Sequence, residues 1–512
     1  MNRKKNYYSI VFGVLASILL LLAGGCASTT GGNASSNKTL TLAFPWSPQS
    51  LDPHGSDSWE VMRSGTAETL VKLNEELKPV PWLAKEWSQE DNTTWQVKLV
   101  DGVHFHNGKQ MDAQSVKDSL LRSIEKDPKV KDLLKIKEID VKGECELSIV
   151  TTQPNAAFIS HLSDPSTIIA DVSSLNDKAN VPALTGAFKI TKFKKDEELI
   201  VERYKDYWGE PALLSEINIK FVPDGTTRLM ALQSGEIDGA TDIPVDNIQL
   251  LERMTQFKVL TAPSLRTHML LFNMQSPLFH ELDFRTIVDQ IIPRKEIVKS
   301  VMMKQGTEAI SPFPNILSFG QKTEQKAKKS IEQVMKQNHW AKDKKGEWKK
   351  QGKAFDVTML TFPQRPELTV MAEIIQNKLL DEGIRVHIRQ VENIDEELEK
   401  GKWDLSMYSM LTAHTGDPQY FLNIFYHSKS QSNVSHYDSP TLDHLIEQLN
   451  QTIRETKRNE LAMRAQEIIQ HDVPQSFIVH PKTVFAIKKN LKGFVPHSIE
   501  YYYVTPEMNI TQ

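Results

Sequence analysis

The sequence has few cysteines and no excess of charge, and both absences narrow what the protein can be. Two cysteines among 512 residues cannot supply a disulfide framework or the four close ligands of a zinc site. The 61 basic residues nearly balance the 65 acidic ones, for a formal net charge of −4, so nothing recommends a nucleic-acid partner. A composition with 39% hydrophobic and 25% charged residues excludes collagen-like, disordered and polytopic membrane proteins.

Catalytic signatures are also missing. The sequence has no Gly-x-Ser-x-Gly elbow, no His-Glu-x-x-His zinc helix and no Gly-x-Gly-x-x-Gly turn. The segment Gly102–Lys109 is one residue too long for a phosphate loop, and Gln110 stands where Ser or Thr would hold magnesium. We therefore expect no enzyme activity and no cofactor. An exported enzyme is the alternative from another functional class, but no nucleophile, base and orienting group can be named for it.

The N-terminus carries the features of an export signal. The apolar run from Ile10 to Ala23 has 14 residues, which is shorter than the roughly 20 residues of a membrane span but typical of a signal peptide. We expect a signal peptide over residues 1–25. Cys26, after two glycines, resembles the acylated cysteine of a bacterial lipobox, although Leu22 lies one place too far back.

Residues 26–37 then predict a lipidated, flexible Gly/Ser-rich linker. The expected location is the extracytoplasmic face of the cell membrane, with the membrane reached through the lipid anchor. An ordinary signal peptide or an uncleaved anchor is the alternative.

The remainder of the chain alternates strand and helix patterns, which favours a mixed α/β fold. Thr39–Phe44 and Trp95–Leu99 alternate as strands do, and apolar residues from Val116 to Ile124 follow helical spacing. Gly235 and Gly383 follow helical patterns and are suited to helix ends. The lysine-rich stretch at 342–353 predicts a solvated helix end and loop.

Short motifs follow one another along the chain in a recognisable order. They are Ser50–His54, Pro81–Trp87, Trp95–Leu99, Val103–Gly108, Asp112–Ala113, Thr185–Phe188, Tyr207–Gly209, Met230–Asp238, Asp417–Pro418 and Tyr437–Pro440. Together they resemble the signature of the family 5 extracellular solute-binding proteins, the receptors of peptide and nickel ABC importers.

This resemblance implies an α/β fold of the two-lobed periplasmic-binding-protein type II clamshell, with an extra subdomain in lobe I. We place lobe I at 38–265, with its subdomain at about 75–182, and lobe II at 266–487. Residues 488–512 would return to lobe I. A ligand would lie in the cleft between the lobes and be trapped when they close.

The expected ligand is a short peptide or a similar small zwitterionic solute. The segment Thr412–Leu422 looks like that of dipeptide-binding members, in which the aspartate matching Asp417 receives the α-ammonium group of the peptide. Arg365 lies in a stretch that resembles one in dipeptide receptors and offers a bidentate fork for a carboxylate. A loop start at Asp417 and a surface arginine at 365 are the plain structural alternatives.

We also expect Trp46, Thr415 and Gly416 to bind the ligand. The predicted function is therefore that of a substrate-binding lipoprotein. It would capture di- or oligopeptides and deliver them to an ABC permease and its ATPase.

The alternative function is binding of nickel or another metal chelate. Nickel-type members bind a carboxylate through an arginine in a Pro-or-Leu-Arg-Pro setting, but the matching stretch Leu162–Thr167 has no arginine. This departure weakens the alternative without removing it, because imidazole ligands are available. The candidates are His414, His436, His104 and His106.

Overall fold

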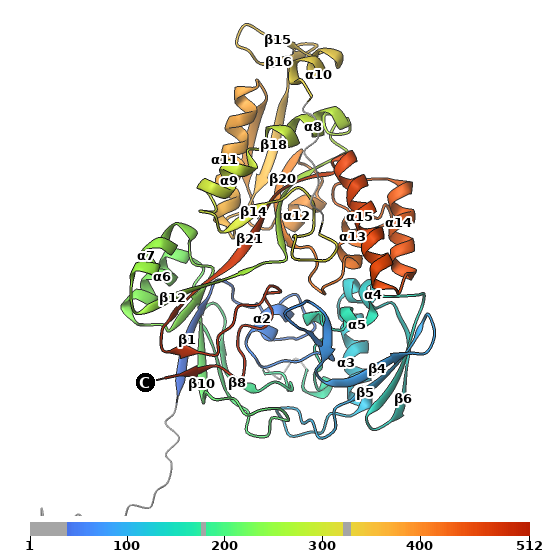
Figure 1. Cartoon of the computed structure of the whole chain (residues 1–512), viewed down its shortest axis with the longest axis vertical. Helices are drawn as coiled ribbons and strands as arrows, with labels where there is room; N and C mark the ends of the chain where they lie inside the picture. The colour runs from blue at the N-terminus through green and yellow to red at the C-terminus, as the bar shows by residue number, and fades with distance from the viewer. Residues whose placement is uncertain (1–37, 176–180, 321–328, 512) are drawn as a thin grey trace, which may run out of the picture. The chain divides into compact units, whose positions relative to one another are not determined.

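The computed structural model of the chain describes residues 38–175, 181–320 and 329–511, and a mixed sheet runs through them (Figure 1). Its strand order is β19-β18-β20-β13-β21-β11-β1-β10-β9-β8, with β12 and β14 paired to β21. The strands are β1 (Thr39–Phe44), β8 (Phe188–Lys194), β9 (Glu198–Arg203), β10 (Glu216–Phe221), β11 (Gly239–Thr241), β12 (Phe257–Pro263), β13 (Arg266–Phe272), β14 (Gly306–Glu308), β18 (Asp356–Thr361), β19 (Arg385–Gln390), β20 (Leu405–Leu411) and β21 (Gln475–Lys488).

Smaller sheets surround this one. They are an antiparallel sheet of β4 (Ala84–Gln89), β5 (Thr94–Leu99), β7 (Glu146–Thr151) and β6 (Ile136–Gly143), the pair β2 (Val71–Leu73) and β3 (Pro79–Pro81), the sheet of β15 (Ala341–Lys342), β16 (Trp348–Lys350) and β17 (Lys353–Ala354), and the pair β22 (Leu491–Lys492) and β23 (Asn509–Ile510).

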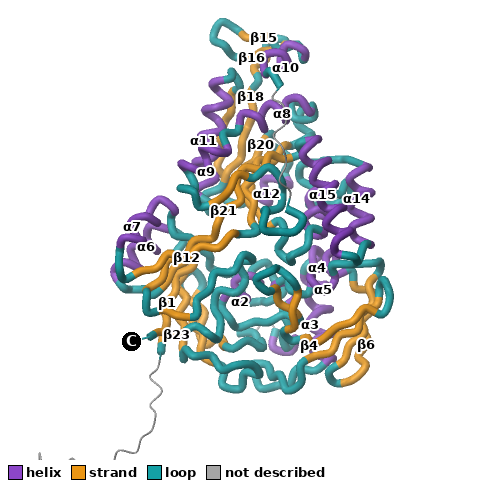
Figure 2. The backbone as a smooth tube through the Cα atoms, viewed as in Figure 1, coloured by secondary structure: helices purple, strands orange, loops and turns teal. Residues whose placement is uncertain are grey.

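Helices cover the sheets, as Figure 2 shows. They are α2 (Ser58–Arg63), α3 (Ala113–Lys126), α4 (Pro128–Leu134), α5 (Phe158–His161), α6 (Gly225–Ser234), α7 (Ile248–Arg253), α8 (Leu282–Ile291), α9 (Arg294–Ser300), α10 (Ile331–Gln337), α11 (Pro366–Asp381), α12 (Ile394–Glu399), α13 (Gln419–Tyr426), α14 (Pro440–Gln451) and α15 (Glu455–Asp472), with short 3-10 turns η1 (Pro165–Thr167), η2 (Val172–Ser174) and η3 (Val245–Asn247).

Local sequence explains where these elements begin and end. Asp112 and Ser115 form a reciprocal capping box that starts α3. Gly235 adopts φ 86 just after α6, a left-handed conformation that side chains with a Cβ resist. The strand predicted at Thr39–Phe44 and the helix predicted around Val116 are confirmed.

Strand β21 links the two halves of the large sheet. Its first residues pair with β13, so that Phe477 lies opposite Met269, and its last residues pair with β12, so that Ala486 lies opposite Val259. Because β12 and β13 are consecutive along the chain, the segment β12–β13 and the strand β21 cross side by side from one half of the sheet to the other (Figures 1 and 2). Bending of these two segments would change the relative position of the two halves.

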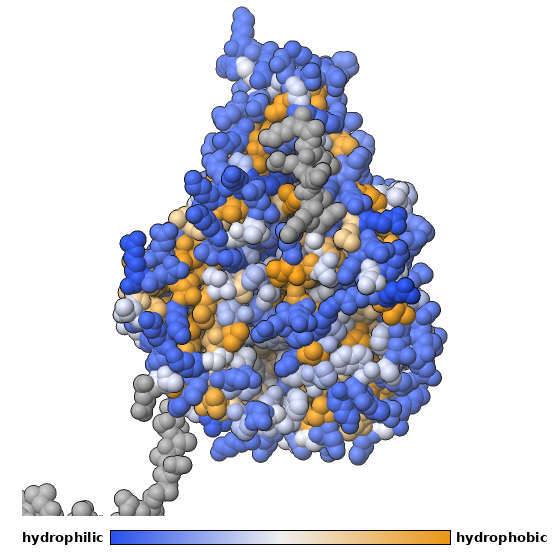
Figure 3. Space-filling model, viewed as in Figure 1, coloured by the Kyte–Doolittle hydropathy of each residue, from blue (hydrophilic) through white to orange (hydrophobic). Residues whose placement is uncertain are grey.

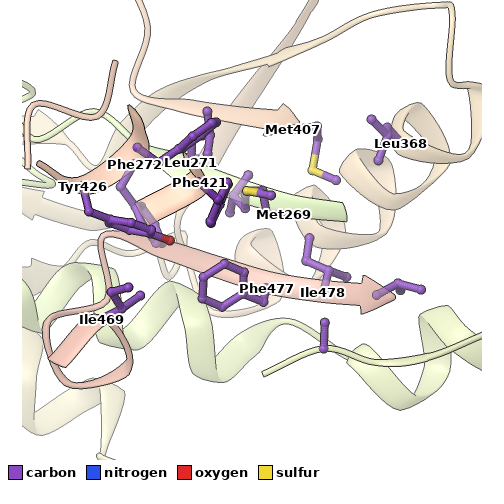
Figure 4. Packing of buried hydrophobic residues seen from close by; sticks show 14 of the residues in the cluster. Met269, Leu271, Phe272, Leu368, Met407, Phe421, Tyr426, Ile469, Phe477 and Ile478 are labelled. Atoms are coloured by element: carbon purple, nitrogen blue, oxygen red, sulfur yellow. The ribbon is translucent and has the colours of Figure 1, made fainter. Parts of the chain in front are cut away.

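Two groups of buried apolar side chains matter for the site. The subdomain core lies between Leu70 and Ala183, under the sheet of β4 to β7 and the helices α3 to α5. The large core comes mostly from residues between Leu265 and Val479. Figure 4 shows the close packing of part of it, with labelled side chains from β13, β20, β21, α11, α13 and α15.

The lysine-rich stretch corrects one expectation. It is not a helix end and loop, because residues 341–354 form the short strands β15, β16 and β17. Gly346, at φ 80, allows the chain to turn between the first two strands. Trp348 is buried on the large core, while the lysines face solvent, and the surface around this hairpin is hydrophilic in Figure 3. One buried tryptophan thus anchors a basic strand.

Within the described ranges, no helix is both long and apolar enough to span a bilayer.

Candidate functional site

Three arginines and a glutamate from distant parts of the sequence meet in what we call the arginine cluster: Arg63, Arg266, Arg365 and Glu500. Arg63 Nε donates to the Glu500 carbonyl at 2.8 Å, and its Nη1 donates to Glu60 at 2.8 Å. Arg266 Nη2 donates to Glu500 Oε2 at 3.0 Å. The C-terminal segment is thereby tied to α2 and to the start of β13.

Glu500 is held ionised and in a strained conformation. Burial would raise its pKa, but Arg266, Arg365 and Arg63 together lower the pKa of Glu500 to about 2. Its φ is 60, and that of nearby Asp242 is 51. Residues with a Cβ adopt this region at a cost, and such strain often occurs at binding sites.

Arg365 is the incompletely paired member of the arginine cluster. It precedes α11, and its side chain is 19% exposed. Within the described residues, its guanidinium makes one ion pair, 3.7 Å from Glu367, and no hydrogen bond. Burial and then Arg266 lower its pKa from the ordinary value of 12.5, but a guanidinium stays charged at neutral pH. Its donors are available to a ligand.

His268 lies beside Arg365 and is neutral. Its Nδ1 is 2.9 Å from Ser409 Oγ, and the ring is almost completely buried. Burial, Arg365 and Arg266 hold the pKa of His268 well below its usual value. The 3.5 Å distance from its Nε2 to Glu367 is therefore not an ion pair. Nε2 has no hydrogen-bond partner among the described residues.

An aromatic cluster adjoins the arginines and consists of Trp59, His414, Tyr420 and Tyr501. The Trp59 ring lies 5.9 Å from the Arg63 guanidinium, 6.4 Å from the His414 ring and 4.8 Å from the Tyr501 ring. The His414 ring contacts that of Tyr420 edge-on at 4.3 Å. Flat apolar faces thus lie next to charged groups, a combination suited to a small polar ligand.

His414 is oriented by a carboxylate. Its Nε2 lies 2.8 Å from Asp164 Oδ2, and both side chains are buried. Burial would raise the pKa of Asp164, but hydrogen bonds from His414 and Ser166 lower it. Nδ1 of His414 makes no hydrogen bond within the described part of the chain, so this nitrogen is available to a ligand.

The structure gives Asp417 a protein partner. Arg458 Nη2 lies 2.6 Å from Asp417 Oδ1 and 2.7 Å from Oδ2, and Arg458 Nε lies 3.2 Å from Oδ2. The backbone N–H of Gln419 also donates to Asp417 at 2.8 Å. A peptide ammonium at Asp417 would have to share a carboxylate that already has four contacts.

Of the other predicted ligand-binding residues, Thr415 and Gly416 directly follow His414, whereas Trp46 belongs to a distant part of the sequence. Thr415 is buried, and its hydroxyl has no hydrogen-bond partner among the described residues. Gly416 has φ 71, and a Cβ there would lie 2.3 Å from the Leu77 carbonyl oxygen, so close backbone packing requires glycine. Trp46 is half-buried in the turn after β1. Cys26 lies outside the described residues.

The remaining histidine candidates lie apart from these clusters. His104 Nδ1 and His106 Nε2 contact the backbone carbonyls of Gly102 and Gly186. His436 lines an open cavity of about 770 Å³ together with His280, Asp438 and Asp472, and none of the predicted ligand-binding residues lines it. In the described parts of the chain, no three histidine, cysteine or acidic side chains are grouped as a metal site.

The sequence predicted Arg365 and His414 as site residues but did not indicate the neighbours that the structure places beside them. Glu500 stands in the run Ser498–Tyr503, where one acidic residue precedes three tyrosines. Such a charge beside aromatic residues is a signal that could have identified it. Arg266 and Asp164 carry no such signal, because only folding brings them to the site.

The chain matches known proteins over most of its length. Residues 78–433 match the family model described as bacterial extracellular solute-binding proteins, family 5 middle. The nickel-binding protein NikA of Staphylococcus aureus is 30% identical over 478 residues, covering 93% of this chain and 94% of NikA. The probable D,D-dipeptide-binding periplasmic protein DdpA of Escherichia coli is 25% identical, with 81% of each chain covered.

A solved structure supports the same relationship. The crystal structure of Staphylococcus aureus NikA in complex with Ni(L-His)2 superposes with a TM-score of 0.83 at 28% identity, covering 93% of this chain and all of that one. The predicted type II binding-protein fold is confirmed. Since the family model spans most of the chain, and similar proteins match nearly all of it, the chain belongs to the bacterial extracellular solute-binding proteins of family 5, the substrate-binding proteins of ABC importers.

Proposed function

We propose that this substrate-binding protein captures a small metal chelate that carries carboxylates, with nickel held by amino acids such as histidine, and delivers it to an ABC permease. One observation carries the proposal: Arg365 is a half-buried guanidinium with free donors, beside a neutral histidine. A ligand carboxylate would complete its pairing with a bidentate contact.

The aromatic cluster supports a chelate in the same place. Aromatic faces of Trp59 and Tyr420 flank His414 and can pack against the imidazole rings of a metal–histidine complex. His414 Nδ1, oriented through Asp164, can accept a hydrogen bond from the complex or occupy an open coordination position. The likeness to a NikA structure with Ni(L-His)2 favours the same ligand class.

A short peptide is the second candidate. The likeness to a probable dipeptide-binding protein favours it, and Arg365 would suit a peptide C-terminus as well as a chelate. The ion pair between Asp417 and Arg458 argues against Asp417 as the ammonium site. We therefore place the peptide second, in contrast to the expectation from sequence.

Calorimetric titration distinguishes the candidates. Nickel with L-histidine, nickel alone, L-histidine alone and a set of dipeptides are titrated separately into the protein. We expect binding of nickel with histidine, weak or no binding of either component alone, and loss of binding with a strong chelator. Tight binding of a dipeptide without metal, and none of nickel with histidine, would establish the peptide instead.

We also propose that the two lobes comprise residues 38–265 with 488–512, and residues 266–487, and that Cys26 is the lipid anchor on the extracytoplasmic face. The first division is supported because the subdomain core lies within residues 38–265, whereas most of the large core comes from residues of the second lobe. For the anchor, Cys26→Ala should release a folded protein from the membrane fraction. Retention of the processed variant in that fraction would contradict it.

A further inference from the structure

A chain of buried polar side chains joins the subdomain core to the large core. Gln419 Nε2, at the start of α13, donates to Asn155 Oδ1 at 2.9 Å. Asn155 is completely buried, and Gln419 is 2% exposed. A second contact runs beside it, in which the backbone N–H of Ala156 donates to the Asn450 carbonyl at 3.2 Å. Both contacts cross from residues near α5 to the helices α13 and α14.

On the subdomain side, Asn155 is fixed by the end of a helix. Its Nδ2 donates to the Leu133 carbonyl at 3.0 Å and the Leu134 carbonyl at 3.2 Å. These belong to the last residues of α4, whose carbonyls have no partner within the helix. Asn155 therefore presents its Oδ1 to Gln419 in one orientation.

On the other side, Gln419 is fixed by Arg458. Arg458 Nη2 lies 3.3 Å from Gln419 Oε1, and its Nη1 donates to the carbonyls of Leu449 and Thr452 at 2.7 and 2.9 Å. Asp417 holds the same guanidinium through both carboxylate oxygens. Arg458 thus ties Gln419 to the C-terminal end of α14, and its donors are occupied by protein groups.

These contacts join the same two regions as the proposed site. His414 and Asp164 of the proposed site connect the same two regions and are buried, so a solute reaches them only when contacts between the regions separate. Neutral amide hydrogen bonds suit a contact that opens and closes, because water replaces them at a small net cost. A pocket of about 420 Å³, lined in part by Gln153, Pro154 and Asn450, adjoins the backbone contact between Ala156 and Asn450.

We propose that Asn155 and Gln419, held by Arg458 and Asp417, form a latch that keeps the two cores together over the bound solute. The latch rests on the proposed function as a closing solute receptor. It assigns Asp417 a positioning role and no contact with the ligand. The latch residues then set how long the solute stays.

The test compares Gln419→Met with Gln448→Met. The first change removes the donor to Asn155 and keeps the length of the side chain. Gln448 is exposed, and among the described residues its side chain bonds only to His444, on its own helix, at 2.9 Å, so the same change there is a matched control. Urea unfolding of each variant first establishes that it folds as the wild type does.

Two quantities are measured. With nickel and L-histidine as the probe, or a dipeptide if that binds, Gln419→Met should raise the dissociation rate constant about tenfold. Small-angle scattering of the ligand-free protein should give a larger radius of gyration than the control. Asn155→Leu combined with Gln419→Met should add little to either single change, because both remove one contact.

An increase of either quantity over the control supports the latch. Equal dissociation rates and equal radii for Gln419→Met and Gln448→Met overturn it. If the wild type binds neither the nickel–histidine probe nor any dipeptide, the proposed function fails by itself. Scattering of the ligand-free variants still decides the latch in that case.

Discussion

The Asp417–Arg458 pair and the arginine cluster are both buried sites of arginine and carboxylate, but they differ in how completely the charges are matched. The Arg458 guanidinium donates hydrogen bonds to Asp417, Gln419 and two backbone carbonyls. In the arginine cluster, Glu500 and Glu60 neutralise Arg63 and Arg266, while the one ion-pair partner of Arg365 among the described residues is Glu367, at 3.7 Å.

This difference distinguishes a site that stabilises the fold from a site that can bind a ligand. A charge whose hydrogen bonds are all made by the protein has nothing left for a ligand, and its loss leaves a partner buried and uncompensated. A charge that is desolvated but incompletely paired gains most when a ligand supplies the missing group. The first site should therefore govern stability and the second should govern affinity.

The largest expected effect is on stability, at the Asp417–Arg458 pair, whose hydrogen bonds are all made within the protein. Arg458→Met leaves Asp417 buried without its cation and should lower the free energy of unfolding by about 3 to 5 kcal/mol. Arg389→Met is the control, because the ion pair of Arg389 with Glu397 is far more exposed and should contribute at most about 1 kcal/mol. Urea denaturation measures both. Equal losses would erase the distinction between the two arginines.

The next largest expected effect is on ligand affinity, at Arg365, the incompletely paired member of the arginine cluster. Arg365→Met should weaken binding of nickel with histidine by about 2 to 5 kcal/mol, roughly 30- to 4,000-fold. Its free energy of unfolding should change by no more than about 1 kcal/mol. Arg365→Lys should restore part of the affinity, because it returns the charge without the planar fork. Calorimetric titration gives the affinities, and unchanged binding by Arg365→Met would refute the assignment.

A third buried carboxylate sharpens the comparison, because it has no arginine. Glu68 accepts hydrogen bonds from Tyr207 and Trp208 at 2.8 and 2.9 Å, yet burial raises its pKa from 4.5 to about 7. The fold thus favours the protonated form. Its contribution to stability is present in full below pH 4.5 and is lost as the pH rises through 7.

Glu68→Gln should remove this loss. Between about pH 4.5 and pH 8, the free energy of unfolding of the variant should rise relative to the wild type by about 3 kcal/mol. Glu500→Gln should behave oppositely and cost stability above about pH 4.5, because the pKa of Glu500 is about 2. Urea denaturation across this range tests both signs. Parallel pH profiles for Glu68→Gln and the wild type would contradict the prediction.

The smallest expected effect is ligand-induced stabilisation of the wild type. At a ligand concentration of about 100 times the dissociation constant, binding should add about 2.7 kcal/mol to the free energy of unfolding. At that same ligand concentration, Arg365→Met should show almost none of this gain, whereas Gln448→Met should show all of it. Thermal denaturation with nickel and histidine measures the difference. Equal gains in the two variants would mean that Arg365 does not bind the ligand.

The sequence predicted the parts of the fold that depend on local pattern. Alternating apolar residues identified the strand at Thr39–Phe44, and helical spacing before Gly235 identified α6 and its end. The basic stretch around Trp348 was predicted wrongly, because its charge pattern conceals the one buried side chain that fixes it as a strand. Ordered motifs were enough to identify the family.

Only the tertiary structure decided which charges remain available. The sequence predicted both Asp417 and Arg365 as ligand-binding residues. No residue near Asp417 in the sequence indicates that Arg458, 41 residues further along the chain, pairs with it. Glu500 lies 437 residues from Arg63 and yet accepts its hydrogen bond. Local propensity and periodicity act over a few residues, so the sequence alone determined the elements and the family. The balance of charge at a buried site depends on every group within a few ångströms, and folding alone brings those groups together.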